Sequence, residues 1–263
     1  MTSERPPIDK RLFVTSAEKC LTVLAAFRRS STPLGLKEIA RLSGLDISAT
    51  QRFVYTLRAL DYLRQDPATK RYSPTVRVLD LSYAYLSNSA LIDCASPYLR
   101  EAHRQTDESI NLVELEGLDI IYVARIPSRK AIATEMACGS RLPAYCSGSG
   151  RAILAHLPEA QATAILEASD RLPLTPHTIT DLDAIRALFP RIRETGYAVN
   201  YQECYVGDLS LAAPIFDRSG RPAASVNISL NMLRWTLEDA LKHCTPVLVE
   251  TATAISRALG AQR

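Results

Sequence analysis

The residues of this chain that could bind another molecule fall into two groups, and the first lies at its basic end. Residues 1 to 73 hold 13 lysines and arginines against 7 acids, whereas residues 74 to 263 hold 18 against 21. A basic segment favours a polyanion partner, because neutralising phosphates is the main sequence-independent source of affinity for nucleic acid. A solvated basic surface is the alternative, so the pattern of the residues has to decide.

Residues 48–60 have a helical period that separates an apolar face from a polar face. Ala49, Phe53 and Leu57 fall on one side at about 100° per residue. On the other side, Gln and Arg can bind base edges with two hydrogen bonds, and hydroxyl groups can reach bases or phosphates. Residues 61–72 form two strand-like pieces around a turn, a basic hairpin that can follow the DNA backbone or the minor groove. The predicted DNA-contacting residues are Ser48, Thr50, Gln51, Arg52, Tyr55, Arg58, Lys70 and Arg71.

The second group surrounds a glycine-rich loop at residues 147–150 that leads into a predicted helix. Free backbone N–H groups and the helix dipole at such a junction favour a carboxylate or a similar anion. Further along the chain, Ser225, Asn227 and Ser229 share one face of a two-residue period, so this strand has one polar face. A solvent-facing sheet surface is the alternative.

An aromatic carboxylate would suit three further residues near this loop. Tyr122 and Arg125 lie on a predicted strand, and Tyr145 precedes the loop. A tyrosine ring can stack on an aromatic ligand, and an arginine can hold a carboxylate with two hydrogen bonds. For Arg125, a solvated surface arginine is the alternative.

The motifs of common enzymes and metal sites fail in this sequence. A nucleophile elbow around Ser149 would need glycine at positions 147 and 151, which are occupied by Ser147 and Arg151. A dinucleotide fingerprint would need a small residue at position 153, which is Ile153, and the sequence contains no Walker loop. The four histidines and six cysteines lack metal-ligand spacing, and the cysteines are expected to be reduced thiols. We expect no catalytic residue, no metal and no cofactor, with a site assembled from distant residues as the alternative.

The elements that would hold the first group are three helices and a hairpin. A capping box of Thr15 and Glu18 predicts the start of the first helix, the second covers residues 36–43 and ends at a glycine, and Asp46 or Ser48 caps the third. Two short helices joined by a tight turn, the second with a polar face, are typical of a helix-turn-helix, and the hairpin adds a wing. A three-helix module for protein contacts is the alternative.

The rest of the chain predicts a linker helix and an α+β domain with an antiparallel sheet. Residues 74–88 have apolar side chains on more than one side of a helix, which indicates packing against a second chain. The predicted strands cover residues 110–115, 119–126, 131–137, 209–216 and 223–230. The predicted helices cover residues 91–108, 151–157, 159–168, 181–194 and 235–259.

In combination, these stretches resemble the IclR family of bacterial transcription regulators. The resemblance rests on residues 36–45, 48–52, 70–74 and 139–155, and it extends over residues 12–260. Residues 139–155 resemble the effector-domain loop, particularly in the branch that controls protocatechuate and 4-hydroxybenzoate catabolism. The resemblance implies a winged helix-turn-helix at 12–73, a linker helix at 74–89 and a GAF-like effector domain at 90–263.

The resemblance also implies which residues contact the effector. They are Gly148, Ser149, Asn200, Ser210, Asn227 and Ser229. Asn200 stands where the founding member of the family has an acid and Ser210 where it has a cysteine, which argues for a ligand other than glyoxylate or pyruvate.

We therefore expect a DNA-binding regulator that responds to a small carboxylate, an aromatic acid of a catabolic pathway, with a non-aromatic acid as the alternative. Its expected partners are double-stranded operator DNA, the carboxylate and further copies of itself in a dimer or tetramer. The first ten residues lack the apolar core of a signal peptide, and no run of eighteen apolar residues occurs. These features predict a cytoplasmic protein with no membrane partner.

Overall fold

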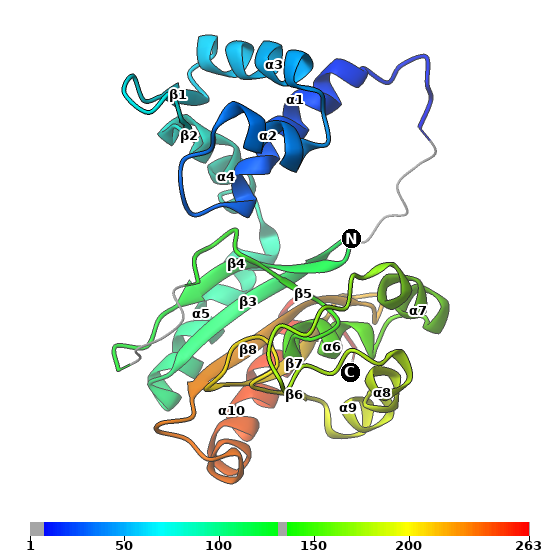
Figure 1. The fold of residues 1–263 in the computed structure, drawn as a ribbon. Coiled ribbons are helices and arrows are strands. Elements are labelled where there is room, and N and C mark those ends of the chain that lie inside the picture. The colour runs from blue at the N-terminus through cyan, green and yellow to red at the C-terminus, as the bar shows by residue number, and fades with distance from the viewer. Residues whose placement is uncertain (1–7, 131–135, 263) are drawn as a thin grey trace. The chain divides into compact units, whose positions relative to one another are not determined.

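A computed structural model describes residues 8–130 and 136–262 (Figure 1). The chain divides into two compact units, of which one ends at Asn88 and the other begins at Ser89. Within the described ranges, no helix is long and apolar enough to cross a membrane.

The N-terminal unit is a three-helix module followed by a short hairpin. Its elements are α1 Thr15–Ala26, a 3₁₀ helix Phe27–Arg29, α2 Leu36–Ser43, α3 Ile47–Ala59, β1 Leu63–Gln65 and β2 Tyr72–Pro74. Val23, Ile39 and Val54, one from each helix, are almost fully buried and form the centre of its core. The predicted winged helix-turn-helix architecture is therefore confirmed.

The ends of these helices agree with the prediction in two of three places. Gly44 ends α2 with φ of 68°, a conformation that favours glycine. The carboxylate of Asp46 caps α3 by accepting a hydrogen bond from the N–H of Ala49 at 2.8 Å. The capping box of Thr15 is wrong, because α1 begins at Thr15 itself and Val14 occupies the cap position without a side-chain hydrogen bond.

The predicted linker helix is shorter than expected and has two parts. A 3₁₀ helix, Val76–Val78, leads into α4, Leu79–Leu86, and neither contains a buried residue. Val76, Leu79 and Tyr83 expose 60% or more of their surface. Large apolar side chains of this segment therefore lie at the surface of the chain.

The C-terminal unit is built on one antiparallel sheet in the order β5-β4-β3-β8-β7-β6. The strands are β3 Ser109–Glu116, β4 Asp119–Ile126, β5 Arg141–Pro143, β6 Ala198–Tyr201, β7 Asp208–Phe216 and β8 Pro222–Asn231. The sequence did not predict β5 and β6, which are only three and four residues long. Most of the predicted strand at residues 131–137 lies outside the described residues.

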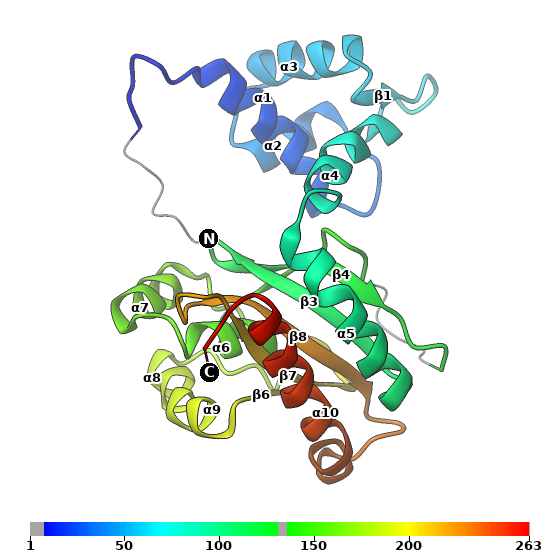
Figure 2. The ribbon, with the colours of Figure 1, turned by 180° about the vertical axis from the view of Figure 1, so that it is seen from behind.

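Helices cover both faces of this sheet. The long helices α5 Ala90–Thr106 and α10 Leu237–Ala258 lie side by side on one face (Figure 2) and enclose an apolar core that includes Leu99, Val226 and Leu248. The shorter helices α6 Gly148–Leu154, α7 Glu159–Ala168, α8 Leu182–Ala187 and α9 Phe189–Thr195 lie on the other side (Figure 1). The predicted α+β class, with an antiparallel sheet flanked by helices, is confirmed.

Two predicted helices differ in extent because of particular residues. The helix predicted at residues 181–194 is split into α8 and α9, and Pro190, which cannot donate a backbone hydrogen bond, stands in the first turn of α9. Helix α6 begins at Gly148 rather than at Arg151, because the hydroxyl of Ser147 caps it by accepting a hydrogen bond from Gly150 N–H at 3.1 Å.

Candidate functional site

The outer face of α3 gathers the polar side chains that the sequence predicts for DNA contact. Ser48, Gln51, Arg52, Tyr55 and Arg58 are all exposed. Four of these side chains border a hollow that is also lined by Tyr72 of the hairpin. An amide, a phenol and two guanidinium groups therefore share one surface, and groups of these kinds contact base edges and phosphates.

Thr50 does not belong to this surface, and its prediction as a DNA contact is wrong. Its side chain is fully buried, and its hydroxyl donates a hydrogen bond to the backbone oxygen of Asp46 at 2.8 Å. The inward stripe of α3 runs through Thr50, Val54 and Leu57, which are three and four residues apart. The stripe is therefore rotated by about one residue from the predicted one.

The hairpin carries its basic residues in two different ways. The carboxylate of Asp66 accepts hydrogen bonds from Ala68 and Thr69, which fixes the turn. Lys70 follows with φ of 58° and is exposed at the tip. The guanidinium of Arg71 donates to Glu38 Oε2 of α2 at 2.8 Å, so this residue attaches the wing to the helices and part of its charge is neutralised.

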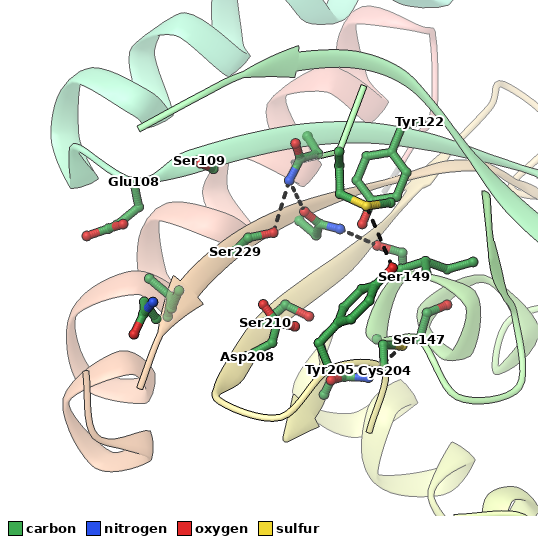
Figure 3. A pocket seen from close by; sticks show the side chains of 18 of the residues that line it. Glu108, Ser109, Tyr122, Ser147, Ser149, Cys204, Tyr205, Asp208, Ser210 and Ser229 are labelled. Carbon is green, nitrogen blue, oxygen red and sulfur yellow. Dashed lines mark hydrogen bonds between the residues drawn. The ribbon is translucent and has the colours of Figure 1, made fainter. Parts of the chain in front are cut away.

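The C-terminal unit contains a cavity of about 340 Å³, which lies against the sheet face that α6 covers (Figure 3). This volume lies within the range typical of small-molecule sites. The predicted effector residues among its lining are Tyr122, Arg125, Gly148, Ser149, Asn200, Ser210, Asn227 and Ser229. Further lining residues that the sequence did not single out include Glu108, Ser109, Asn111, Met136, Cys204, Tyr205 and Asp208.

Strand register places the polar lining in two neighbouring rows. In one, which we call the amide row, Asn111 of β3 pairs with Arg125 of β4 on one side and Asn227 of β8 on the other. In the next, which we call the serine row, successive pairings join Ser109, Ser229, Ser210 and Asn200. Residues from five strands thus face one cavity, because in antiparallel sheets paired residues point to the same side.

Hydrogen bonds connect the rows to the glycine-rich loop. The amide of Asn111 donates to Asn227 Oδ1 at 2.6 Å and to Ser229 Oγ at 3.1 Å. The amide of Asn227 donates to Ser149 Oγ at 2.9 Å, as Figure 3 shows. The cavity wall is therefore a preorganised array of amides and hydroxyls.

Two polar atoms at this wall have no hydrogen-bond partner among the described residues. They are Nε of Arg125 and Oδ1 of Asn111, which belong to cross-strand neighbours in the amide row. The Arg125 guanidinium also donates to the backbone oxygen of Met136. Since buried polar atoms normally have partners, this donor and this acceptor are suited to a bound ligand.

The acidic groups of the cavity differ in their partners and in their pKa values. Glu108 is held by Arg234 at 2.8 Å and by the indole N–H of Trp235 at 2.9 Å, so its charge is compensated. Burial raises the pKa of Asp208 to about 6. Burial also raises the pKa of Tyr122, whose hydroxyl therefore stays protonated at neutral pH. The cavity thus offers a cation, a carboxyl group and several neutral donors.

Tyr145 does not line the cavity, and its prediction as an effector contact is wrong. Its side chain is buried, and its hydroxyl donates to the backbone oxygen of Leu172 at 2.5 Å. Gly150, the second glycine of the loop, has a packing role. A Cβ on Gly150 would lie 2.2 Å from the oxygen of Ala144, so this glycine is required by packing of the chain on itself.

An ion pair that the sequence analysis missed joins α6 to the loop after β6. The guanidinium of Arg151 binds both carboxylate oxygens of Glu203, at 2.5 and 2.6 Å, and donates to the oxygen of Tyr145 at 2.8 Å. The N–H of Ile179 donates to the same carboxylate at 2.9 Å. Both charged side chains are buried, and they fix the segments on which Ser149 and Cys204 line the cavity.

Two family models match this chain. The IclR helix-turn-helix domain matches residues 16–67, and the bacterial transcriptional regulator IclR C-terminal domain matches residues 83–257. The chain belongs to the IclR family of transcriptional regulators. The family predicted from the sequence is therefore confirmed.

Individual relatives of this IclR-family regulator match over four fifths of their length or more. The Pca regulon regulatory protein of Pseudomonas putida is 34% identical over 238 residues, 90% of this chain and 81% of that protein. A solved structure from Rhodococcus sp. RHA1, described as that of a candidate transcriptional regulator, is 37% identical, with a TM-score of 0.77 over 94% of this chain and 98% of that one. The IclR of Thermotoga maritima is 27% identical, with a TM-score of 0.70 over 94% and 99%.

Proposed function

We propose that this regulator binds operator DNA through α3 and the wing, and that a small hydroxylated aromatic acid in the cavity changes its affinity for that DNA. The observation that carries the ligand proposal is the Nε of Arg125 at the wall of the cavity, which has no hydrogen-bond partner within residues 8–130 and 136–262. A carboxylate is the simplest group that would satisfy such a donor with a charge-assisted hydrogen bond.

The remaining walls of the cavity support an aromatic body with a hydroxyl group. Ile120, Leu142 and the ring of Tyr122 provide apolar surface. Asp208 and the serine row offer acceptors for a ligand hydroxyl. The Pseudomonas putida relative is named for the pca regulon, which supports the aromatic-acid branch predicted from the sequence. A non-aromatic acid is the second candidate, since the polar rows would also suit a hydroxy acid without a ring.

Control of DNA binding follows from linkage between two sites. A ligand that favours one arrangement of the DNA-binding units changes operator affinity by a coupling free energy, typically about 1–3 kcal/mol. The proposed role is one of binding rather than catalysis, and the proposed DNA target supports action in the cytoplasm.

Self-association through α4 forms part of this proposal. Helix α4 contains no buried residue, although Leu79, Leu81 and Tyr83 are large and apolar. Pairing with a second copy would cover these side chains and present two recognition helices to the two halves of a symmetric operator.

A binding experiment on the full-length protein tests the ligand. We expect 4-hydroxybenzoate or protocatechuate to raise the melting temperature of the C-terminal unit, since a ligand at 100 times its Kd stabilises the folded state by about 2.7 kcal/mol. Arg125→Met should abolish this shift, whereas Arg129→Met, an exposed neighbour outside the cavity lining, should retain it. A shift with lactate but not with the aromatic acids would favour the second candidate.

DNA binding is tested by selecting duplexes that bind the protein from a random library. The binding of the selected duplex is then measured by anisotropy titrations at several salt concentrations. Arg52→Ala or Gln51→Ala should weaken the selected duplex by about 1–3 kcal/mol, and Lys70→Ala should reduce the salt slope by about one. Arg218→Ala, a charge change at an exposed position of the C-terminal unit, serves as the control. Unchanged binding in the first three variants would remove α3 and the wing from the interface.

A further inference from the structure

Two thiols that lie far apart in the sequence meet beside the cavity. The Sγ atoms of Cys146 and Cys204 are 3.8 Å apart, and both side chains are buried. Cys146 directly precedes Ser147, the cap of α6, and Cys204 lies in the loop between β6 and β7. Neither thiol has a role in the function proposed above.

The cavity provides a route to this pair. Cys204 is one of the lining residues, whereas Cys146 lies directly behind it. Bulk solvent reaches at most 6% of either residue. A reagent small enough to enter the cavity can therefore reach the pair, while larger thiol reagents cannot reach it from the outer surface.

The surroundings of Cys146 favour its ionised form. The hydrogen bond between the two sulfur atoms lowers the pKa of Cys146, against the opposing effect of burial, and the Arg151 guanidinium adds to the lowering. The thiolate is the nucleophilic form of cysteine, and nearby cations and hydrogen-bond donors favour it.

We propose that Cys146 and Cys204 form an oxidisable dithiol site, which hydrogen peroxide entering through the ligand cavity converts into a disulfide. The Cys146 thiolate attacks one peroxide oxygen, the O–O bond breaks, and the leaving hydroxide takes up a proton to form water. The Cys204 thiol then attacks the resulting sulfenic acid, an S–S bond forms, and a second water leaves. Two thiols are oxidised by two electrons, and one peroxide is reduced to two waters.

Disulfide formation would change the wall of the cavity. The sulfur atoms must approach from 3.8 Å to about 2.05 Å. Asn200, in the serine row, donates to the backbone oxygen of Cys146 at 2.5 Å and lies 3.5 Å from Cys204 Sγ. Oxidation would therefore move a lining side chain and disturb the partners of another. This effect on ligand binding rests on the proposed function, whereas the disulfide itself does not.

The chain provides matched controls among its own cysteines. Cys244 is equally buried, but it lies in the core between the sheet, α5 and α10. Burial raises its pKa to about 11. Cys138 is exposed. Burial alone predicts equal protection of Cys244 and the pair, and exposure alone predicts that Cys138 reacts first.

The experiment treats the folded, full-length protein with hydrogen peroxide, blocks remaining thiols with an alkylating reagent after denaturation, and identifies tryptic peptides by mass spectrometry. Trypsin separates the two cysteines into peptides 142–151 and 194–218, each of which contains a single cysteine. We expect these peptides to become cross-linked with the loss of two hydrogens, at least about tenfold faster than Cys244 loses its free thiol. Dithiothreitol should reverse the cross-link.

Single variants identify the attacking thiol. In Cys204→Ser, the sulfenic acid on Cys146 has no resolving thiol, so dimedone should label peptide 142–151. Cys204→Ala repeats this test if the serine variant does not fold. Oxidation that occurs only at Cys138, or a cross-link that forms only after denaturation, would overturn the proposal.

The effect on the ligand is measured separately, by titrating the reduced and the oxidised protein with 4-hydroxybenzoate. We expect a lower affinity after oxidation. Equal affinities would overturn the regulatory consequence. If the cross-link forms but the reduced protein does not bind 4-hydroxybenzoate, the result counts against the proposed ligand. The same result still supports the dithiol site.

Discussion

Removing one partner of the buried ion pair between Arg151 and Glu203 should destabilise the C-terminal unit far more than removing an exposed pair. The Arg151 side chain is 1% exposed and that of Glu203 is 6% exposed. Glu203→Gln keeps the shape of the side chain but leaves a buried guanidinium without its counter-charge. Loss of one partner from such a pair costs about 3–5 kcal/mol. Glu159→Gln, which breaks an exposed pair with Arg186, should cost less than about 1 kcal/mol.

Urea unfolding followed by tryptophan fluorescence can measure this difference. Trp235 is the sole tryptophan of the chain and lies in the C-terminal unit, so its emission reports on that unit. With a slope of about 2 kcal/mol per M, the unfolding midpoint of Glu203→Gln should fall by about 1.5–2.5 M. The double variant Arg151→Met/Glu203→Leu should regain most of the loss, because a buried apolar pair requires no counter-charge.

Equal midpoints for Glu203→Gln and Glu159→Gln would refute this reasoning. Such a result would mean that water or another group compensates the guanidinium once the carboxylate is gone. The segments carrying Ser149 and Cys204 would then be positioned by other contacts.

Three further predictions concern single positions. Gly150→Ala should destabilise the C-terminal unit by more than about 2 kcal/mol in urea unfolding, because the new Cβ would overlap the Ala144 backbone. Gly148→Ala, whose new Cβ would have its nearest contact at 3.4 Å, should be tolerated, and equal stabilities of the two variants would contradict the packing argument. The folded protein keeps the Asp208 proton up to about pH 6, so this group's stabilising contribution is complete below about pH 4 and is lost as the pH rises through 6. Asp208→Asn should therefore be more stable than the parent at pH 8 by up to about 3 kcal/mol and equal to it near pH 4, and a pH-independent difference would argue against burial as the cause. Leu81→Glu on α4 should reduce the molar mass measured by light scattering, because a charge would replace an exposed apolar side chain of the proposed interface. Arg77→Glu, at an exposed position of the preceding 3₁₀ helix, serves as the control. A molar mass unchanged by Leu81→Glu would exclude α4 as the interface.

Local patterns predicted the elements of this protein well where one side of an element is buried. The strand-like run predicted at residues 119–126 corresponds to β4, and Gly44 marks the end of α2 because its backbone conformation favours glycine. Asn227 and Ser229 were predicted as binding residues from alternation and resemblance together, and both line the cavity. In these cases the information lies within a few neighbouring residues.

The predictions failed where the deciding contact lies elsewhere in the chain. Thr50 and Tyr145 are hydrogen-bonding residues beside correctly placed motifs, but each is turned inward to a backbone oxygen that sequence spacing does not reveal. Asp208 stands at the first position of β7, where no alternation had yet begun. The partnership of Arg151 with Glu203 spans 52 residues, and no local spacing connects the two.

The sheet of the C-terminal unit keeps its ligand-facing and core-facing positions apart. Asn111 and Asn227 point into the cavity, whereas their neighbours Leu112 and Val226 pack beneath α5 and α10. A change in the amide or serine row therefore alters what the cavity can recognise without making a hole in that apolar core. Such separation allows the ligand specificity of related proteins to diverge while the fold stays the same. It also identifies the two rows as the positions at which the ligand specificity of an engineered sensor could be changed.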